Sequence, residues 1–480
     1  MFRGMDLPGN TSYLHELLNP SSPFPTRLRS GTVSGREGPF WEGLVFKRSL
    51  QAAVPAVLPT SYSVRNRFSS SAAHPAQASQ SSRSPHIVVG ITSPQTCLVL
   101  GGRLRTLREA GFRVTLVSGP GELLSRTAAQ EGVESIAIPM RREIAPLADL
   151  VSLARLWWLL NRLKPEMTEF STPKAGLLGS IAALLCGVPT RVYFLRGLKL
   201  ETCTGVKRRI LLATERVASA CSHAVLCNSD SLRSEALALG LAPESKLRML
   251  GSGSSNGVDV ERFQPGPSNL RARLGLPLHA HVVGFVGRLT RDKGLPELVE
   301  AFDVILAAKP KAHLLLVGWF DAAEDALGDD LRSHIESHPR IHMTGFVADT
   351  SPYYRVMDVM VLPTWREGFP NVVLEAAATG IPVVTTLCTG SRDAVVPEVT
   401  GLLIPPGYPV AISEAVLQLL RSPKRRCRMG LAARAWVIEH FVNGRVLGLT
   451  VGYYKSLLER NLTRDSRIGP VTADSALYPI

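Results

Sequence analysis

The sequence predicts an α/β protein built from two Rossmann-like, doubly wound domains that face a cleft. Short apolar runs alternate with segments of helical periodicity from residue 86 almost to the end of the chain. Such alternation is typical of parallel sheets covered by helices on both faces. One Pro- and Gly-rich stretch, residues 263–277, interrupts the series. With 480 residues, of which 45% are hydrophobic, the chain is long enough for two or three domains.

Residues 1–84 differ in composition from the rest of the chain. They are rich in Ser, Pro and Arg, and no acidic residue occurs between Glu42 and Glu109. Such a segment buries too little apolar surface to offset the entropy lost on ordering, so we expect a disordered N-terminal extension. A transit peptide would also be basic and Ser-rich. We favour an upstream extension of the reading frame.

The first domain is expected over residues 85–262. Its strands are the runs HIVVGI, RVTLVS, ESIAIP, RVYFLRG, HAVLCNS and KLRMLG, which begin at residues 86, 113, 134, 191, 223 and 246. A helical segment, GRLRTLREAGF, follows the first of these strands. Because Pro and Gly interrupt regular elements, we expect residues 263–277 to be the linker between the domains.

The second domain is expected over residues 278–440. Its strands are the runs HVVGFVG, HLLLVG, IHMTG, DVMVLP, PVVTT and GLLIP, which begin at residues 281, 313, 341, 358, 382 and 401. A helix over 441–460 should pack back toward the first domain, and the tail 461–480 should be loose. Ligands of open parallel sheets bind beyond the carboxyl ends of the strands, so we expect the site in the cleft between the domains.

Charge and cysteine content limit the partners and the compartment. A formal net charge of +14 suits nucleic acid, an anionic membrane surface or phosphorylated substrates. No helix-turn-helix or zinc-ligand spacing occurs, so nucleic acid is not expected. None of the seven cysteines forms a Cys-x-x-Cys pair, which favours a reducing cytosol. No uncharged apolar run of about 18 residues is present. We therefore expect a cytoplasmic protein, with the inner face of the plasma membrane as an open alternative.

The stretch REGFPNVVLEAAATGIPVV, residues 366–384, places Glu367 and Glu375 on either side of a helix start at Pro370-Asn371. The first N–H groups of a helix and its dipole favour a phosphate. A carboxylate beside a diphosphate is tolerable where it accepts hydrogen bonds from hydroxyl groups, as sugars and ribose supply. The pattern therefore suggests a nucleotide sugar, with ribose on Glu375 and hexose near Glu367. An ordinary helix with acidic residues near its start is the alternative.

This stretch closely resembles the Glu-x7-Glu segment of family 4 glycosyltransferases, which have the GT-B architecture. The resemblance covers roughly residues 86–458 and implies a retaining hexosyl transfer from a nucleoside-diphosphate sugar. It implies that Glu367 is catalytic and that the residues after it bind the donor, namely Gly368, Phe369, Pro370, Asn371 and Glu375.

The run FVGRLTRDKG, residues 285–294, carries Arg288 and Lys293 on a loop between a strand and a helix. Two such cations can clamp a diphosphate, although a solvated pair would look the same. The run resembles the G-R-L-x-x-x-K-G element of the same enzymes, which implies that both cations bind the donor phosphates. Gly287 is counted with the donor site. The resemblance further implies base contacts through the backbone after a later strand, at Gly345, Phe346 and Val347.

The first domain should bind the acceptor. Gly101 and Gly102 lie between the first strand and its helix, where glycine permits close approach of a ligand to the backbone. RVYFLRGLKLET and GSGSSNGVDVERF resemble enzymes of polysaccharide or lipid-linked oligosaccharide assembly. Many relatives have a histidine where this sequence has Arg196, which we include among the catalytic candidates. Arg196 could neutralise charge on an acceptor or on the leaving phosphate, or it could be structural.

Two basic helical segments could lie on an anionic leaflet. LARLWWLLNRLK, residues 153–164, carries Trp157 and Trp158, and VKRRILLATERVA, residues 206–218, carries three adjacent basic residues. Core packing with a solvated basic face is the simpler interpretation of each. The expected partners are therefore a nucleotide sugar, a carbohydrate or lipid-linked acceptor and, as an open alternative, an anionic membrane.

The expected mechanism is electrostatic. Arg288, Lys293 and the helix N-terminus would stabilise the departing diphosphate, and a donor phosphate oxygen would take the acceptor proton. No Asp-x-Asp pair occurs, so neither a metal held by such a pair nor another cofactor is indicated. A GT-B-fold sugar-nucleotide 2-epimerase and a non-catalytic sugar-nucleotide-binding protein are the alternatives. The epimerase would turn over the donor without an acceptor.

Overall fold

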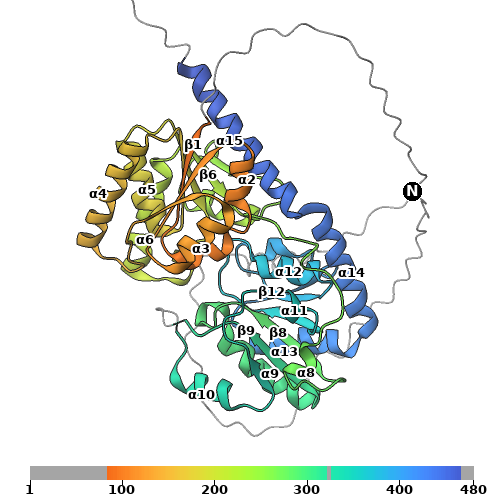
Figure 1. The fold of residues 1–480 in the computed structure, drawn as a ribbon. Coiled ribbons are helices and arrows are strands. Elements are labelled where there is room, and N and C mark those ends of the chain that lie inside the picture. The colour runs from red at the N-terminus through yellow and green to blue at the C-terminus, as the bar shows by residue number, and fades with distance from the viewer. Residues whose placement is uncertain (1–83, 322–325, 466–480) are drawn as a thin grey trace, which may run out of the picture. The chain divides into compact units, whose positions relative to one another are not determined.

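A computed structural model describes residues 84–321 and 326–465, with side chains as far as residue 460. The predictions for residues 1–83 and 466–480 lie outside the described residues. Two parallel sheets, one of seven strands and one of six, form the framework (Figure 1). The predicted fold class, two doubly wound α/β domains, is confirmed.

The first sheet has the strand order β3-β2-β1-β4-β5-β6-β7, with every pair parallel. Its strands are β1 (His86–Gly90), β2 (Arg113–Ser118), β3 (Glu134–Ala137), β4 (Met167–Ser171), β5 (Thr190–Leu195), β6 (Ala224–Cys227) and β7 (Leu247–Met249). Strand β4 was not among the predicted strands. Its residues Thr168 and Glu169 are buried, so the strand lacks the continuous apolar run that marks its neighbours.

Helices cover both faces of this sheet, so alternate residues of β1 enter different cores. Ile87 and Val89 join a core with Leu104 of α2 (Arg103–Glu109), whereas Val88 joins one with Leu156 of α4 (Pro146–Leu163). Figure 1 shows α4 and α5 side by side, away from α2. The remaining elements of this domain are η1 (Pro94–Val99), α3 (Glu122–Glu131), α5 (Pro173–Leu185), η2 (Lys199–Thr202), α6 (Gly205–Ala220) and α7 (Asp230–Ala238).

The second sheet has the order β10-β9-β8-β11-β12-β13 and is also parallel. Its strands are β8 (His281–Val286), β9 (Ala312–Val317), β10 (Ile341–Met343), β11 (Val359–Leu362), β12 (Val383–Thr386) and β13 (Gly401–Ile404). Each corresponds to one predicted run. Apart from the edge strand β10, these strands are mostly apolar and buried on both faces.

The helical elements around the second sheet begin within the expected linker. They are α8 (Leu270–Arg273), η3 (Arg291–Lys293), α9 (Leu295–Ala308), α10 (Asp329–Ser337), α11 (Ser351–Tyr354), α12 (Asn371–Ala378), η4 (Arg392–Ala394), α13 (Pro409–Arg421) and α14 (Pro423–His440). Within the stretch 263–277, Phe263, Leu270 and Leu276 are buried in the second core. This stretch therefore packs as part of the second domain.

The last helix, α15 (Asn443–Asp465), returns to the first domain and packs against α2 and β5. Tyr454 from this helix is fully buried in the core that also contains Leu104. The helix extends five residues past the predicted end at residue 460. It therefore ties the two domains together.

Strand order reverses between β1 and β4 in the first sheet and between β8 and β11 in the second. At such a switch point, loops at the carboxyl ends of the adjacent strands diverge and leave a crevice for ligands. The site described next contains the loops that follow β8 and β11.

Candidate functional site

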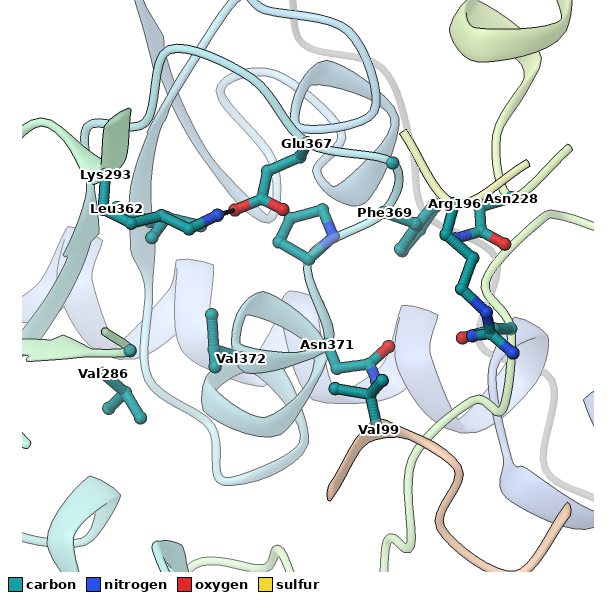
Figure 2. A pocket seen from close by; sticks show the side chains of 14 residues that line it. Val99, Arg196, Asn228, Val286, Lys293, Leu362, Glu367, Phe369, Asn371 and Val372 are labelled. Atoms are coloured by element: carbon teal, nitrogen blue, oxygen red, sulfur yellow. Dashed lines mark hydrogen bonds and ion pairs between the residues drawn. The ribbon is translucent and has the colours of Figure 1, made fainter. Parts of the chain in front are cut away.

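A pocket of about 240 Å3 lies between the two domains (Figure 2). The second domain contributes the last residues of β8 and β11, residues in the segments that follow these strands, and the start of α12. The first domain contributes residues that follow β1, β5, β6 and β7. The full lining is Val99, Arg196, Asn228, Ser255, Val286, Gly287, Lys293, Leu362, Glu367, Gly368, Phe369, Pro370, Asn371 and Val372.

The helix start predicted at Pro370-Asn371 forms the floor of this pocket. Pro370 is the N-cap of α12, and its backbone is extended (φ −78°, ψ 107°). Asn371 and Val372 are the first two helical residues and line the pocket. The backbone N–H groups of a first turn have no partner within their own helix. This end of the pocket therefore presents the partial positive charge that anions prefer.

Gly368 is required where the two domains touch. A Cβ atom on Gly368 would lie 2.1 Å from the carbonyl oxygen of Arg196, and a Cβ atom on Gly197 would lie 3.1 Å from the Gly368 nitrogen. The backbone of Gly390 approaches equally closely, since a Cβ there would lie 2.2 Å from the Gly368 oxygen. Side chains at these positions would force the loops apart, so the glycines set the width of the pocket.

Lys293 and Glu367 form an ion pair in the pocket, with Lys293 Nζ 2.5 Å from Glu367 Oε1. Both side chains are mostly buried, with 16% exposure each. The next residue, Gly294, has a φ of +71° and lies so close to the Pro363 carbonyl that no side chain fits there. This close contact positions the backbone of the loop that carries Lys293. The structure thus brings together two of the predicted site residues.

Asp292, the residue before Lys293, stabilises the loop that carries this lysine. Its carboxylate accepts hydrogen bonds from Thr290 (2.6 Å) and from Arg366 Nη2 (2.8 Å). Burial would raise the pKa of Asp292, but Lys293 and Arg366 outweigh that effect and hold the pKa below its ordinary value. An ionised Asp292 helps to fix the loop that carries Lys293.

Arg288 does not line the pocket as expected. Its Nη1 lies 2.7 Å from Oδ2 of Asp321, a residue in the segment that follows the neighbouring strand β9. Arg142 of the first domain is 3.8 Å from the same oxygen. A guanidinium and a carboxylate 2.7 Å apart form a charge-assisted hydrogen bond. Arg288 is thus paired with Asp321, whereas Lys293 lines the pocket.

Glu375 also lies outside the pocket lining. Tyr354 donates a hydrogen bond of 2.8 Å to its Oε2, and Thr350 donates one of 3.4 Å. Burial raises the pKa of Glu375, although the hydrogen bond from Tyr354 acts in the opposite direction. The carboxylate is on the same helix as the pocket floor, one turn further along.

The three residues expected to contact the base follow β10 and do not line the pocket. Gly345 (φ +68°) bridges to Gly318, and Val347 packs against the second core. Phe346 is 51% exposed and packs edge-on against Trp319, with ring centroids 5.4 Å apart. Trp319 was not among the predicted residues, although its place directly after the strand run HLLLVG could have indicated it.

Arg196 does line the pocket, and beneath it lies a buried group of charges. Arg103 Nη2 is 2.7 Å from Glu169 Oε2, and neither side chain is exposed. Tyr454 donates a 2.5 Å hydrogen bond to the same carboxylate oxygen. Arg196 Nη2 is 3.8 Å from Glu169 Oε1, and its guanidinium lies over the ring of Phe194 at 4.4 Å. The sequence analysis missed Arg103, Glu169 and Tyr454.

Asn228 and Ser255 are further lining residues that sequence reasoning missed. Asn228 follows β6 within the run HAVLCNS, so its place at the carboxyl end of a strand was a usable signal. Ser255 belongs to a loop whose position depends on contacts with α15, such as Asn443 Nδ2 to Asn256 O at 2.8 Å. No local pattern marks such a residue.

The two glycines expected on the acceptor side are near the pocket but do not line it. Gly101 is exposed, and no atom lies within 4 Å of the position of an added Cβ. Gly102 has φ +74°, precedes α2, and donates its N–H to Glu131 Oε1 at 3.1 Å. Val99, which lies two residues before Gly101, is the residue from this part of the chain that lines the pocket.

A second contact joins the domains beside the pocket. Ser231, at the start of α7, hydrogen-bonds through Oγ to Asp393, and Gly390 N–H donates to the same Oγ at 2.7 Å. Glu201 lies nearby, where burial raises its pKa to about 7 against a weaker opposing effect of Thr389. The domains thus meet through specific polar contacts as well as the glycine backbones.

Within residues 84–321 and 326–465, no three His, Cys, Asp or Glu side chains are grouped so as to hold a metal ion. In the same part of the chain, no helix is both long enough and apolar enough to cross a bilayer.

Comparison with known proteins assigns both domains to described families. Residues 100–253 match the model of the glycosyl transferase 4-like domain, and residues 280–422 match that of glycosyl transferases group 1. The chain is 34% identical to the capsular polysaccharide biosynthesis glycosyltransferase CapM of Staphylococcus aureus over 352 residues, which cover 73% of this chain and 92% of CapM.

Two further similarities point the same way. The UDP-Gal:alpha-D-GlcNAc-diphosphoundecaprenol alpha-1,3-galactosyltransferase of Escherichia coli is 28% identical over 281 residues, covering 57% of this chain and 71% of that protein. The crystal structure of Anabaena Alr3699/HepE in complex with UDP and glucose superimposes with a TM-score of 0.66 at 19% identity, covering 78% of this chain and all of HepE.

Proposed function

Because the chain belongs to the glycosyltransferases that combine a glycosyl transferase 4-like domain with a glycosyl transferases group 1 domain, we propose that it moves a hexose from a nucleoside-diphosphate sugar to a hydroxyl group. The anomeric configuration would be retained. The acceptor would be a carbohydrate or a lipid-linked saccharide in polysaccharide or lipid-linked oligosaccharide assembly. The strongest support for this proposal is that Lys293, Glu367 and the start of α12 line one pocket between the domains.

The donor diphosphate would bind between Lys293 Nζ and the first N–H groups of α12. Its charge competes with Glu367 for Lys293, so the ion pair would open and leave the Glu367 carboxylate to accept hydrogen bonds from sugar hydroxyls. Arg288 would exchange Asp321 for a phosphate oxygen, because phosphate offers the same bidentate geometry with more charge. Glu375 would accept a hydroxyl of the ribose.

In the transfer, the bond between the anomeric carbon and the donor phosphate oxygen breaks. A new bond forms between that carbon and the acceptor oxygen, on the face that the phosphate leaves. The acceptor proton passes to the departing phosphate oxygen, and the nucleoside diphosphate is released. Lys293 and the α12 amides stabilise the growing negative charge on that oxygen, which is electrostatic catalysis without a strong protein base.

Similarity to named relatives supports the substrate classes. HepE was solved with UDP and glucose, and the E. coli relative is named for UDP-Gal and for an acceptor linked to diphosphoundecaprenol. UDP-hexoses are therefore the first donors to test. Both matched family models and the two relatives are glycosyltransferases, so the 2-epimerase alternative is not favoured.

A panel of UDP-hexoses with purified chain tests the function. We expect the donors that fit to raise the thermal midpoint by mass action, and sugar transfer to need an added saccharide acceptor. The anomeric proton coupling of the product, measured by NMR, should match that of the donor. Epimerised donor without acceptor would identify an epimerase, and binding without any turnover would identify a non-catalytic protein.

We also propose that helix α4 contacts an anionic bilayer. Its outward face carries an apolar stripe that is unusual for a surface helix: Leu147, Leu150, Val151, Trp157 and Trp158 are all exposed. The Cys186 thiol contacts the Trp157 carbonyl at 3.4 Å, which brings exposed Leu184 and Leu185 of α5 close to this stripe.

The rim of this apolar stripe is basic. Arg155, Arg162 and Lys164 are exposed, and the Arg162 guanidinium lies over the Trp158 ring at 5.5 Å. The one acidic residue within α4, Asp149, is 2.5 Å from Lys174 Nζ. Apolar and aromatic residues rimmed by cations suit the interface of an anionic membrane, where a lipid-linked acceptor would be presented.

A further inference from the structure

The charges beneath the pocket do not balance. Arg103 and Arg196 are both within ion-pair distance of one carboxylate, Glu169, and neither has another acidic partner among the described residues. Burial and Glu169 raise the pKa of the Tyr454 hydroxyl, so it is neutral. Two guanidinium groups and one carboxylate therefore leave one net positive charge in the wall of the pocket.

The excess charge belongs to Arg196. Arg103 holds Glu169 Oε2 at 2.7 Å and also donates to Tyr454 and to the Ser255 carbonyl. Arg196 is 3.8 Å from the other carboxylate oxygen, and its Nε and Nη2 have no hydrogen-bond partner within residues 84–321 and 326–465. Its side chain is only 11% exposed. Burial and Arg103 lower the pKa of Arg196 to about 10, which leaves it charged at neutral pH.

A buried charge with unmet donors is costly unless a ligand completes it. Arg196 faces the pocket with Asn228 and Asn371 (Figure 2), and the side-chain oxygens of both asparagines also have no partner among the described residues. The guanidinium would accept an anion, while the amide oxygens would accept hydrogen bonds from sugar hydroxyls. This combination fits a saccharide that carries a phosphate group.

We propose that Arg196 binds a phosphate group of the acceptor, so that the natural acceptor is a phosphorylated or diphosphate-linked saccharide. The proposal rests on the function proposed above and adds the chemical class of the acceptor. The donor phosphates have their own cationic partners in Lys293 and α12. In Figure 2, Arg196 lies with Asn228 on the side of the pocket away from Lys293. It follows β5 of the first domain, from which the acceptor should approach.

Anion binding to the nucleotide-loaded protein tests this assignment. Inorganic pyrophosphate, the probe, is titrated calorimetrically into the full chain with and without saturating UDP. We expect it to bind the UDP-loaded protein, about tenfold more weakly in Arg196→Met and nearly as well in Arg196→Lys. Arg113→Met, a change of an exposed arginine on β2, is the matched control and should bind like the unchanged chain.

Two results would overturn the assignment. If pyrophosphate binds the UDP-free chain but not the UDP-loaded chain, Arg196 belongs to the donor phosphates. Equal pyrophosphate binding by Arg196→Met and the unchanged chain would mean that Arg196 binds no anion. With UDP saturating, pyrophosphate should also raise the thermal midpoint of the unchanged chain and not that of Arg196→Met, a difference that a purely structural arginine would not produce. Failure of every nucleoside diphosphate to bind would instead overturn the proposed function.

Discussion

Lys293 Nζ lies 2.5 Å from Glu367 Oε1, and both side chains line the pocket between the two domains. The pair places a positively charged ammonium and a negatively charged carboxylate side by side in the pocket lining. A diphosphate would attract Lys293 and repel Glu367, so its arrival would separate the pair and direct the carboxylate toward hydroxyl groups. The two residues should therefore fail in different ways when replaced.

Lys293→Met should weaken binding of a nucleoside diphosphate about tenfold and lower kcat about a hundredfold, because it removes charge that both the bound and the departing diphosphate use. Calorimetry and initial rates measure the two effects. Equal UDP affinity in Lys293→Met and the unchanged chain would contradict this role.

Glu367→Gln should leave the affinity for UDP within about threefold and lower kcat about a hundredfold, since UDP carries no hexose for this side chain to hold. Gln keeps the shape and loses the charge. A large loss of UDP affinity with kcat unchanged would show that Glu367 acts on the nucleotide and not on the sugar.

Gly368→Ala should separate the domains, because its Cβ would lie 2.1 Å from the Arg196 carbonyl oxygen. We expect a lower thermal midpoint and a loss of transfer activity. Gly101→Ala is the matched control: an added Cβ has open space there, and it should stabilise by about 0.5 kcal/mol through the unfolded state. If Gly368→Ala and Gly101→Ala melt and react alike, the close approach of the two loops is not maintained in solution.

Arg103→Met and Arg196→Met should have opposite effects on stability. Removing Arg103 leaves the fully buried Glu169 without its close partner and should cost about 3 kcal/mol of unfolding free energy. Removing Arg196 eliminates an uncompensated charge, so stability should stay equal or rise, as expected where function rather than stability maintains a residue. Urea denaturation measures both. A loss in Arg196→Met as large as that in Arg103→Met would assign Arg196 a structural role.

Glu215 should make stability depend on pH. It is 3% exposed and accepts a 2.6 Å hydrogen bond from Tyr193, and burial raises its pKa to about 7. Below the pKa of the unfolded state, near 4.5, both states are protonated and nothing is lost. Between that pH and about 7 the unfolded state alone ionises, so folding becomes less favourable by up to about 3 kcal/mol.

Glu215→Gln removes this ionisation and keeps the hydrogen bond from Tyr193. Relative to the unchanged chain, it should therefore gain stability between pH 4.5 and 8, and the same comparison at low pH serves as its control. A difference in unfolding free energy that does not change with pH would contradict the raised pKa.

The α4 surface predicts binding to anionic vesicles. Trp158→Glu with Leu150→Glu should lower co-sedimentation with phosphatidylglycerol-containing vesicles and leave transfer to a water-soluble acceptor unchanged. Binding of the unchanged chain should weaken with salt, since the basic rim acts through screened charges. Equal sedimentation of the variant and the unchanged chain would remove α4 as the contact. Equal binding to neutral vesicles would contradict the role of the rim.

The sequence predicted strands well where burial coincides with apolar composition. All six strands of the second sheet appear as apolar runs. Strand β4 escaped detection because Glu169 occupies a buried position that is tolerable only beside Arg103, 66 positions earlier in the chain. A contact at that separation has no local signature, so the missed strand and the missed charge cluster have one cause.

The candidate site, like the strands, could be predicted only where local sequence determines the position of a residue. Lys293, Glu367 and the α12 start belong to loops whose local geometry determines where they point, and the structure brings them together. Arg288 pairs with Asp321, which lies 33 positions later in the chain, so no local pattern indicates this partner. Ser255 reaches the pocket from a loop whose position depends on contacts with α15, and those contacts join residues far apart in the chain.

A crystal structure of the full chain with a bound UDP-hexose would show whether Lys293 and α12 hold the donor. We expect the diphosphate within hydrogen-bond distance of Lys293 Nζ and of the first backbone N–H groups of α12, with the ion pair to Glu367 opened and the hexose against its carboxylate. A nucleotide bound elsewhere, with Lys293 and Glu367 still paired, would contradict it.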